Sequence, residues 1–367
     1  MKQTVDVAAY IWPAYTGTEP RARIFWEEGE GEWQTVRRAA PKFPGHPWPR
    51  RPLWGYVDEA DPQVMERQIE AALSHGVNVF IYDWYWYDGR PFLEQCLDNG
   101  FLGASNCRSM RFYLMWANHD AKYVWDKRNA EDSKTVVWRG KVTPEDFEVI
   151  GRRWLEQYFG LENYYRIDGR PLIAIYDIQN FVDSFGGVEQ TAEAMRWLDG
   201  LARGSGLAGV HFQLINCGEK NTGLTGVDGE PGIPMREVCR LLPFSSITHY
   251  QFVHFVNINR AYDAVLPDVE AEWARNAGQY GLLYLPHVSI GWDNNPRFST
   301  LRPNILRDNT PEAFGRAMRR AVAAAKATGA PMVTVNSWNE WTEGSYLEPD
   351  NINGYGYLEA IRQAVLE

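Results

Sequence analysis

The segment DPQVMERQIEAALSHGVNVFIYDW, residues 61–84, predicts one complete unit of the fold. Its first half is amphipathic with helical spacing. Asp61 and Pro62 favour a helix start, and Gly76 favours a helix stop. Its second half, VNVFIYDW, is a nearly continuous apolar run of strand length. Such a run is typical of a parallel strand that is buried on both faces. The segment therefore predicts a helix that leads into a parallel strand.

The same alternation continues along the whole chain. The predicted strands cover residues 5–12, 77–84, 111–118, 170–177, 210–216, 246–252, 282–292 and 331–338. The predicted helices cover residues 61–75, 91–99, 143–159, 187–204, 234–242, 268–281, 310–329 and 356–367. Eight such units predict an α/β fold, a single (β/α)8 TIM barrel with elaborated βα loops, and we expect residues 1–367 to form one catalytic domain. A doubly wound open sheet is the alternative, but no glycine-rich phosphate turn follows the first strand.

The composition suits a partner that contains rings and is compatible with an uncharged one. The 367 residues include 16 Trp, 19 Tyr and 16 Phe. A surplus of Trp and Tyr suits an open groove that stacks on rings, although a large core also uses aromatic side chains. The net charge of −10 argues against nucleic acid or an anionic membrane as the partner. A carbohydrate substrate is compatible with both observations, and the oligomeric state stays open.

Cysteine spacing and the N-terminus bear on cofactors and location. Cys96, Cys107, Cys217 and Cys239 are far apart and form no CxxC pair, so neither a zinc site nor a disulfide framework is predicted. The seven histidines include no HExxH motif, and we expect no metal and no cofactor. No apolar run approaches the length of a membrane span, and the first residues resemble a strand more than a signal peptide. These features favour a cytoplasmic protein, although a trimmed secreted chain would look the same.

Nearly every predicted strand ends in polar and aromatic residues. In a (β/α)8 barrel the reactive groups lie at these carboxyl ends of the strands. Aromatic faces combined with amides and carboxylates suit a sugar, because its C–H faces stack while its hydroxyls form hydrogen bonds. The candidate substrate-binding residues are Tyr10, Trp12, Asp83, Trp84, Trp86, Trp116, Asn118, His119, Tyr176, Asn216, Tyr250, His287, Trp292 and Asn339.

The eighth strand leads into VTVNSWNEWTEGSYLEP, residues 333–349, which crowds three glutamates between aromatic residues. In a continuous strand Glu340 and Glu343 would face opposite sides. A turn helped by Gly344 would instead place both on one side. Two carboxyls that share a site separate their pKa values, so that one is ionised and the other protonated. Glu340 and Glu343 are therefore the candidate catalytic pair for breaking a glycosidic bond, and we expect Glu348 to anchor the loop.

Three stretches carry a resemblance to a known family. SWNEWTEGSYLEP (337–349), YIWPAY (10–15) and GVNVFIYDWYWYDGRPFLE (76–94) resemble the glycoside hydrolase family 99-like proteins. These include WbsX-type proteins, which carry the name of glycosyltransferases of bacterial polysaccharide loci. The resemblance covers essentially the whole chain. It implies a (β/α)8 barrel that acts on α-linked glycans, as the endo-acting α-mannosidases of family 99 do.

The resemblance also implies roles for the two glutamates. Glu340 matches the residue proposed to assist the 2-hydroxyl of the sugar, and Glu343 matches the acid that protonates the leaving oxygen. The implied route retains the anomeric configuration and passes through a 1,2-anhydro sugar. Thr342 stands where the related mannosidases have a histidine-containing version of the motif, so the resemblance does not assign the sugar.

Three hypotheses follow. The leading one is a retaining glycoside hydrolase that acts on α-linked glycans, α-mannosides among them. The second is a WbsX-type glycosyltransferase or transglycosylase of bacterial polysaccharide biosynthesis, although no nucleotide-sugar signature is visible in the sequence. The third is a non-catalytic glycan-binding barrel, which would keep the aromatic residues but would not need the carboxyl pair.

Overall fold

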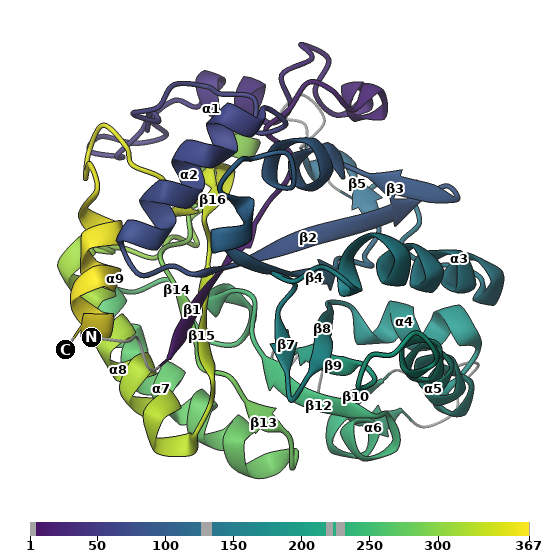
Figure 1. The fold of residues 1–367 in the computed structure, drawn as a ribbon. Coiled ribbons are helices and arrows are strands. Elements are labelled where there is room, and N and C mark those ends of the chain that lie inside the picture. The colour runs from purple at the N-terminus through teal and green to yellow at the C-terminus, as the bar shows by residue number, and fades with distance from the viewer. Residues whose placement is uncertain (1–4, 126–133, 218–222, 225–231, 367) are drawn as a thin grey trace.

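The fold is built on a curled parallel sheet in a computed structural model that describes residues 5–125, 134–217, 223–224 and 232–366 (Figure 1). Nine strands follow each other in the spatial order β13-β12-β9-β8-β4-β2-β1-β15-β14. Their bounds are β1 Asp6–Ile11, β2 Val79–Tyr87, β4 Arg111–Trp116, β8 Arg170–Ile175, β9 His211–Ile215, β12 Phe244–Thr248, β13 Leu283–Tyr284, β14 His287–Ser289 and β15 Met332–Asn336. Two short strands, β3 (Arg90–Phe92) and β7 (Arg166–Ile167), pair antiparallel with β2 and β8. The sheet is TIM-barrel-like, as the strand–helix alternation predicts.

The two end strands of this order are consecutive in the chain. Only Leu285 and Pro286 separate β13 from β14. The Leu285 N–H donates to the Ile247 carbonyl of β12 over 2.9 Å, and the Pro286 carbonyl accepts from the Thr334 N–H of β15 over 2.9 Å. This short linking segment therefore contacts the strands on both sides of it.

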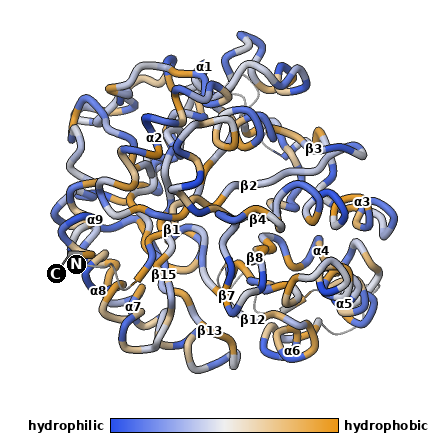
Figure 2. Tube along the Cα trace, viewed as in Figure 1, coloured by the Kyte–Doolittle hydropathy of each residue, from blue (hydrophilic) through white to orange (hydrophobic). Residues whose placement is uncertain are grey.

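Helices surround the sheet (Figure 1). Their bounds are α1 Trp33–Arg38, α2 Pro62–Ser74, α3 Pro144–Trp154, α4 Ile178–Phe185, α5 Val188–Gly204, α6 Met235–Leu241, α7 Tyr262–Gln279, α8 Pro311–Thr328 and α9 Gly356–Leu366. Apolar residues gather along the central strands, while many residues at the outer surface are polar (Figure 2). All nine residues of β2 are buried, which agrees with a parallel strand covered on both faces.

The predicted start of α2 at Asp61 is confirmed, and two other helices have side-chain caps as well. Asp61 caps α2, and its carboxylate accepts the Gln63 N–H over 2.8 Å. Thr143 and Asp146 form a capping box at the start of α3, and Thr310 caps α8. These caps satisfy backbone N–H groups that have no partner inside the helix. No helix in the described part of the chain has the length and apolarity needed to cross a membrane.

Several elements differ from the sequence prediction, among them α1, which was not predicted. Helix α7 begins at Tyr262, and Pro267 lies inside it rather than before its start. The stretch 282–292 divides into β13 and β14 at Pro286. Residues 90–101 form β3 and a π-helical turn instead of one short helix. Helix α4, of eight residues, was not predicted. Proline position and short elements are weak signals in a single sequence, because packing against the core decides them.

Candidate active site

A tight hairpin after β15 holds the two candidate catalytic glutamates. Strands β16 (Asn339–Glu340) and β17 (Ser345–Tyr346) pair antiparallel around a 3-10 turn at 341–343. Gly344 closes the turn with a φ of +62°, in the left-handed region that glycine adopts without strain. The predicted turn is therefore present, and Glu340 and Glu343 reach the same guanidinium, that of Arg297.

Arg297 joins three carboxylates in the floor of the site. It lies in a 3-10 turn at Asn295–Arg297, in the loop after β14. Its Nη1 is 2.7 Å from Glu343 Oε1, its Nη2 is 3.5 Å from Glu340 Oε2, and its Nε is 3.1 Å from Glu32 Oε1. Burial alone would lower the pKa of Arg297, but Glu32, Glu343 and Glu340 raise this pKa well above its usual value. One buried cation is thus shared by three carboxyl groups.

A pocket of about 150 Å³ opens above this cluster. Its walls come from the carboxyl ends of β1, β2, β4, β8, β12, β14 and β15 and from the segments that follow these strands. The lining residues are Trp12, Asp83, Tyr85, Met115, Ala117, His119, Trp125, Tyr176, Tyr250, Arg297, Glu340 and Glu343. The site therefore lies where parallel α/β sheets place ligands. Aromatic walls with carboxyl groups at the base suit the faces and hydroxyls of a sugar.

Tyr250 connects a third carboxyl to the pair. Its hydroxyl is 2.9 Å from Asp83 Oδ2 and 3.1 Å from Glu340 Oε1. A phenol has one proton to donate, so the second short contact requires a proton on Asp83 or on Glu340. The other oxygen of Asp83, Oδ1, is buried without a hydrogen-bond partner among the described residues. Asp83 can therefore accept a hydrogen bond from a ligand hydroxyl.

Burial dominates the electrostatics of these carboxyls. Burial raises the pKa of Glu340 well above its usual value; the charge of Glu343 raises this pKa further, and Arg297 lowers it. Burial also raises the pKa of Glu343, against the lowering effect of Arg297. The pKa of Asp83 is raised well above its usual value by burial, despite the bond from Tyr250. Burial lowers the pKa of His119, so this imidazole is neutral at pH 7. The site can hold protons on carboxyls at neutral pH.

A buried polar network fixes the hairpin from below. Glu348 accepts the Trp341 indole N–H over 2.6 Å and the Gln68 amide over 2.9 Å, which confirms its predicted anchoring role. The Gln68 amide oxygen in turn accepts the Trp338 indole N–H over 3.0 Å. Asn339 donates to both oxygens of Glu59 and pairs with the backbone of Trp12. These bonds tie the glutamate hairpin to α2 and to the end of β1.

The structure brings seven of the sixteen predicted site residues together. Those that line the pocket are Trp12, Asp83, His119, Tyr176, Tyr250, Glu340 and Glu343. Tyr10 and Asn339 lie just outside this layer: the Tyr10 ring contacts the Tyr250 ring at a centroid distance of 4.8 Å, and Asn339 holds the chain beside Glu340.

Four predicted tryptophans, Trp84, Trp86, Trp116 and Trp292, lie outside this pocket, which corrects the expectation drawn from the sequence. Trp84 donates to Glu94 over 2.7 Å and stacks on Trp86. Trp86 lines a separate cavity of about 610 Å³ beside Trp138. Trp116 packs in the core between α3 and α4. For these three the reason is the two-residue period of a strand: Asp83, Tyr85 and Met115 face the pocket, so their neighbours face the helices.

Trp292 and three other predicted residues have structural contacts. Asn118 joins the backbone of Asp177 through two 2.7 Å bonds. Asn216 donates to Asn276 over 2.8 Å. His287 is buried between Thr334 and Ser289, and burial lowers its pKa. Trp292 is partly buried against the core.

Sequence reasoning missed Arg297, Glu32, Tyr85 and Trp125. One signal could have found Arg297, because a crowded carboxyl pair needs a countercharge from a neighbouring loop. Tyr85 follows from the strand period that includes Asp83. No local pattern marks Glu32 or Trp125, because long loops after β1 and β4 bring them to the pocket.

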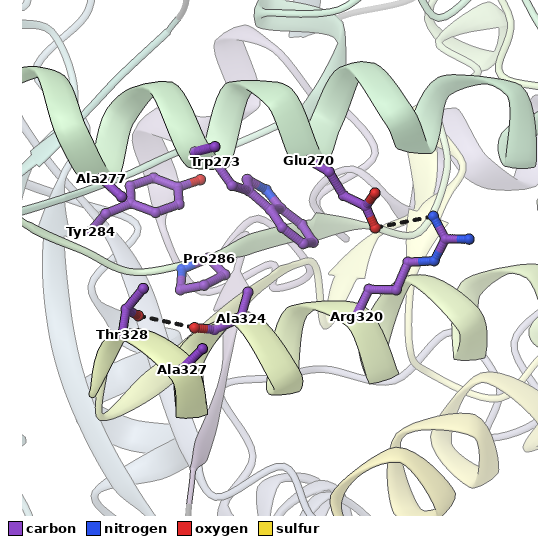
Figure 3. A pocket seen from close by; sticks show the side chains of 10 residues that line it. Glu270, Trp273, Ala277, Tyr284, Pro286, Arg320, Ala324, Ala327 and Thr328 are labelled. Atoms are coloured by element: carbon purple, nitrogen blue, oxygen red, sulfur yellow. Dashed lines mark hydrogen bonds and ion pairs between the residues drawn. The ribbon is translucent and has the colours of Figure 1, made fainter.

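Two further cavities differ in whether they share lining residues with the carboxyl pocket. A cavity of about 440 Å³ adjoins the carboxyl pocket and shares His119, Trp125 and Tyr176 with it. Another cavity, of about 330 Å³, lies between α7 and α8 (Figure 3). Its walls are mainly alanine and aromatic side chains, with an ion pair of 3.0 Å between Glu270 and Arg320 at one end. It shares no lining residue with the carboxyl pocket.

A model of the family described as glycosyltransferase WbsX matches residues 7–361. The chain belongs to this family. Two strains of Xanthomonas campestris pv. campestris have a protein named uncharacterized protein WxcX that is 30% identical over 356 residues. The match covers 94% of this chain and 48% of each relative, so the WbsX-family chain described here spans about half the length of the curated relatives it matches.

Solved structures share the fold. A GH99 endo-alpha-mannosidase from Bacteroides thetaiotaomicron is similar with a TM-score of 0.59 and 15% identity, covering 98% of this chain and 96% of that one. A protein titled glycoside hydrolase-like protein is similar with a TM-score of 0.64 and 15% identity, covering 99% and 94%. At this identity the likeness concerns the fold, which is that of glycoside hydrolases related to family 99.

Proposed function

We propose that this chain is a retaining glycoside hydrolase that acts on α-linked glycans, with Glu340 and Glu343 as its catalytic pair. The observation that carries the proposal is the shared guanidinium: both glutamates bind Arg297 at the base of one aromatic pocket. The family-99 fold supports the same substrate class, because a structural relative is titled an endo-alpha-mannosidase. A non-catalytic glycan-binding protein would not need a buried acid pair, which is costly to keep.

The proposed reaction has two steps, and each step uses two proton transfers. Glu340, as a carboxylate, takes the proton of the sugar 2-hydroxyl while that oxygen attacks C1. Glu343, as an acid, gives its proton to the leaving oxygen as the C1–O bond breaks. Water then attacks C1 of the 1,2-anhydro sugar, loses a proton to Glu343, and Glu340 returns its proton to the 2-oxygen. Two inversions at C1 give net retention, and both glutamates end as they began.

The contacts of the two glutamates indicate which of them carries the proton before substrate binds. Arg297 is closer to Glu343, at 2.7 Å, than to Glu340, at 3.5 Å, and the Tyr250 hydroxyl, 3.1 Å from Glu340, can accept a hydrogen bond from a protonated Glu340. This arrangement favours the proton on Glu340 before substrate binds. Substrate binding must therefore move the proton to Glu343; otherwise the two glutamates exchange roles. The leaving-group dependence of the two Gln variants distinguishes these alternatives.

We also propose that the curled sheet closes into a complete (β/α)8 barrel. The short segment from β13 to β14 would act as one interrupted seventh strand. Its two backbone bonds, from Leu285 to β12 and from Thr334 to Pro286, support this closure. Closure would bring the loops after β1 and β14, which supply Glu32 and Arg297, to one rim.

Glycosyl transfer is the second candidate, because the family carries the description glycosyltransferase WbsX. A retaining pair can pass the sugar to an acceptor hydroxyl instead of water, with the same two glutamates. Transfer from a nucleotide sugar would need a further site for a pyrophosphate, and the cation that contacts the pair, Arg297, already binds three carboxylates. The pocket therefore favours a glycoside donor.

The test is a panel of aryl α-glycosides and α-linked oligosaccharides, with products followed by proton NMR from the first turnover. We expect the wild-type chain to release a reducing sugar from an α-glycoside, and the first-formed anomer should keep the α configuration. The Glu340→Gln, Glu343→Gln double variant is the control and should release none. Product only from nucleotide-sugar donors would favour the transferase instead, and binding without turnover on every substrate would favour a glycan-binding protein.

A further inference from the structure

Glu32 is a carboxylate that none of the proposed steps uses, although it is completely buried beside the reacting pair. It lies at the start of α1, in the long segment between β1 and β2. Its Oε2 accepts the Trp12 indole N–H over 2.6 Å, and its Oε1 accepts the Arg297 Nε–H over 3.1 Å. Tyr15 approaches the same Oε2 at 3.5 Å. A fully buried carboxyl with these contacts requires an explanation.

The partners of Glu32 determine its protonation. An indole N–H and a guanidinium N–H can only donate, so both close contacts require acceptor oxygens on Glu32. Glu340 differs, because the Tyr250 hydroxyl beside it can accept a hydrogen bond. These two donors stabilise a negative charge on Glu32, whereas the Tyr250 hydroxyl offers an acceptor for a proton on Glu340.

The buried cluster contains more acidic groups than basic groups. The single positive charge of Arg297 faces Glu32, Glu340 and Glu343 in a buried cluster. An uncompensated buried charge is costly, and such groups take up protons instead. If Glu32 stays ionised, it neutralises Arg297, and the two remaining carboxyls must keep at least one proton between them.

We propose that Glu32 is a positioning residue for the proton of the catalytic pair: as a permanent carboxylate it occupies Arg297 and so keeps one proton on Glu340 and Glu343 at neutral pH. This inference rests on the proposed function, because a hydrolase of this type needs one acid and one base at the same time. Glu32 touches no atom of the pair directly; it acts through the guanidinium.

The other ionisable groups around the pair do not replace Glu32. Asp83 approaches through Tyr250 and, like the pair, is driven toward its protonated form by burial. The phenols of Tyr15, Tyr85, Tyr176 and Tyr250 have pKa values raised well above the usual value by burial, so they stay neutral. Burial lowers the pKa of His119, and this imidazole is neutral as well. Arg297 and Glu32 are therefore the fixed charges that face the pair.

The first experiment compares pH–rate profiles of the wild type and Glu32→Gln. The amide keeps the size of the side chain but leaves the charge of Arg297 uncompensated. The pair should then lose its proton more easily, and the basic limb of the profile should move to lower pH by about one to two pH units. Activity lost at neutral pH should return on acidification.

Glu32→Asp carries its charge farther from Arg297, so it should shift the limb in the same direction by less. Tyr15→Phe removes a contact to Glu32 without changing charge and should leave the limb unmoved.

A second readout separates this inference from the proposed function. Infrared spectroscopy of the substrate-free protein detects the C=O stretch of protonated carboxyls, and the bands absent from Glu340→Gln and Glu343→Gln identify the pair. We expect the midpoint of these bands to move to lower pH in Glu32→Gln.

An unmoved or raised midpoint in folded Glu32→Gln overturns the inference even if hydrolysis is found. If Glu32→Gln does not fold, an unmoved midpoint in Glu32→Asp has the same consequence. A lowered midpoint without detectable hydrolysis would support the inference while the proposed function fails.

Discussion

At the residue scale, the tryptophans of this chain have two distinct roles. Trp12 and Trp125 line the carboxyl pocket, whereas Trp116 fills the space between β4, α3 and α4 against Phe147, Trp154 and Phe181. A surplus of aromatic residues therefore does not identify a sugar groove by itself. The position of each ring on its strand decides which role it has.

Trp116→Ala should act on stability rather than on sugar binding. Removing a fully buried indole costs the transfer energy of the ring and leaves a cavity, about 3–5 kcal/mol in unfolding free energy. Denaturant unfolding measures this loss, and the Michaelis constant of the folded fraction should stay near that of the wild type. Tyr176→Ala is the matched comparison, because Tyr176 lines both adjoining cavities, and it should weaken binding more than it lowers stability. The opposite pattern would contradict these placements.

Single residues were predictable only where a local rule applied. The turn at Gly344 follows from glycine and from the spacing of Glu340 and Glu343, and the structure confirms it. The strand period could have excluded Trp84 and Trp116 from the pocket, but this requires knowing which face of the strand is inside. Arg297 and Glu32 come from different long loops, and no sequence spacing relates residues 265 positions apart.

At the scale of elements, α2 and the glutamate hairpin are joined by buried carboxyls. Glu59 accepts from Asn339 and Gln68, and Glu348 accepts from Trp341 and the same Gln68. Burial raises the pKa of Glu59 to about 7, although its hydrogen bonds act in the opposite direction. The folded state therefore binds the Glu59 proton more tightly than the unfolded chain does, near neutral pH.

This linkage predicts a pH-dependent stability. Between the unfolded pKa of about 4.5 and the folded value of about 7, the folded protein holds more protons than the unfolded one. The Glu59 contribution to the unfolding free energy is complete below this window and is lost as pH rises through it. The Glu59→Gln variant has no such proton to lose, so its unfolding free energy should decline less over this range. The unfolding free energy of the wild type minus that of the variant should therefore decrease from pH 4.5 to pH 7. Glu193→Gln, at an exposed site on α5, is the control; equal pH dependence in both variants would contradict the prediction.

Elements were the most predictable level of this structure. Caps at Asp61, Thr143 and Thr310 mark helix starts within one residue of those observed, because capping depends on local hydrogen bonds. Helix α7 was predicted too short, because Pro267 resembles a helix start but lies within the helix. The loops that carry Glu32 and Trp125 have no such local signals.

At the scale of the whole molecule, the fold brings residues from seven strand ends into one pocket. A buried cation contacts the two glutamates there, and aromatic side chains form much of the wall. The parallel sheet explains why these distant segments meet, since all their carboxyl ends point to the same side. The central claim is that Glu340 and Glu343 divide the roles of base and acid in glycoside cleavage.

The most direct test compares Glu340→Gln and Glu343→Gln on two α-glycosides of the same sugar, one with an activated nitrophenyl leaving group and one with an alkyl group. For Glu343→Gln we expect a loss of about a hundred- to ten-thousand-fold on the alkyl glycoside and a much smaller loss on the nitrophenyl glycoside, which needs little protonation. Glu340→Gln should be crippled on both, because assistance to the 2-hydroxyl is needed whatever group departs. Equal losses for Glu343→Gln on the two substrates, or rescue of Glu340→Gln by the activated one, would contradict the assignment.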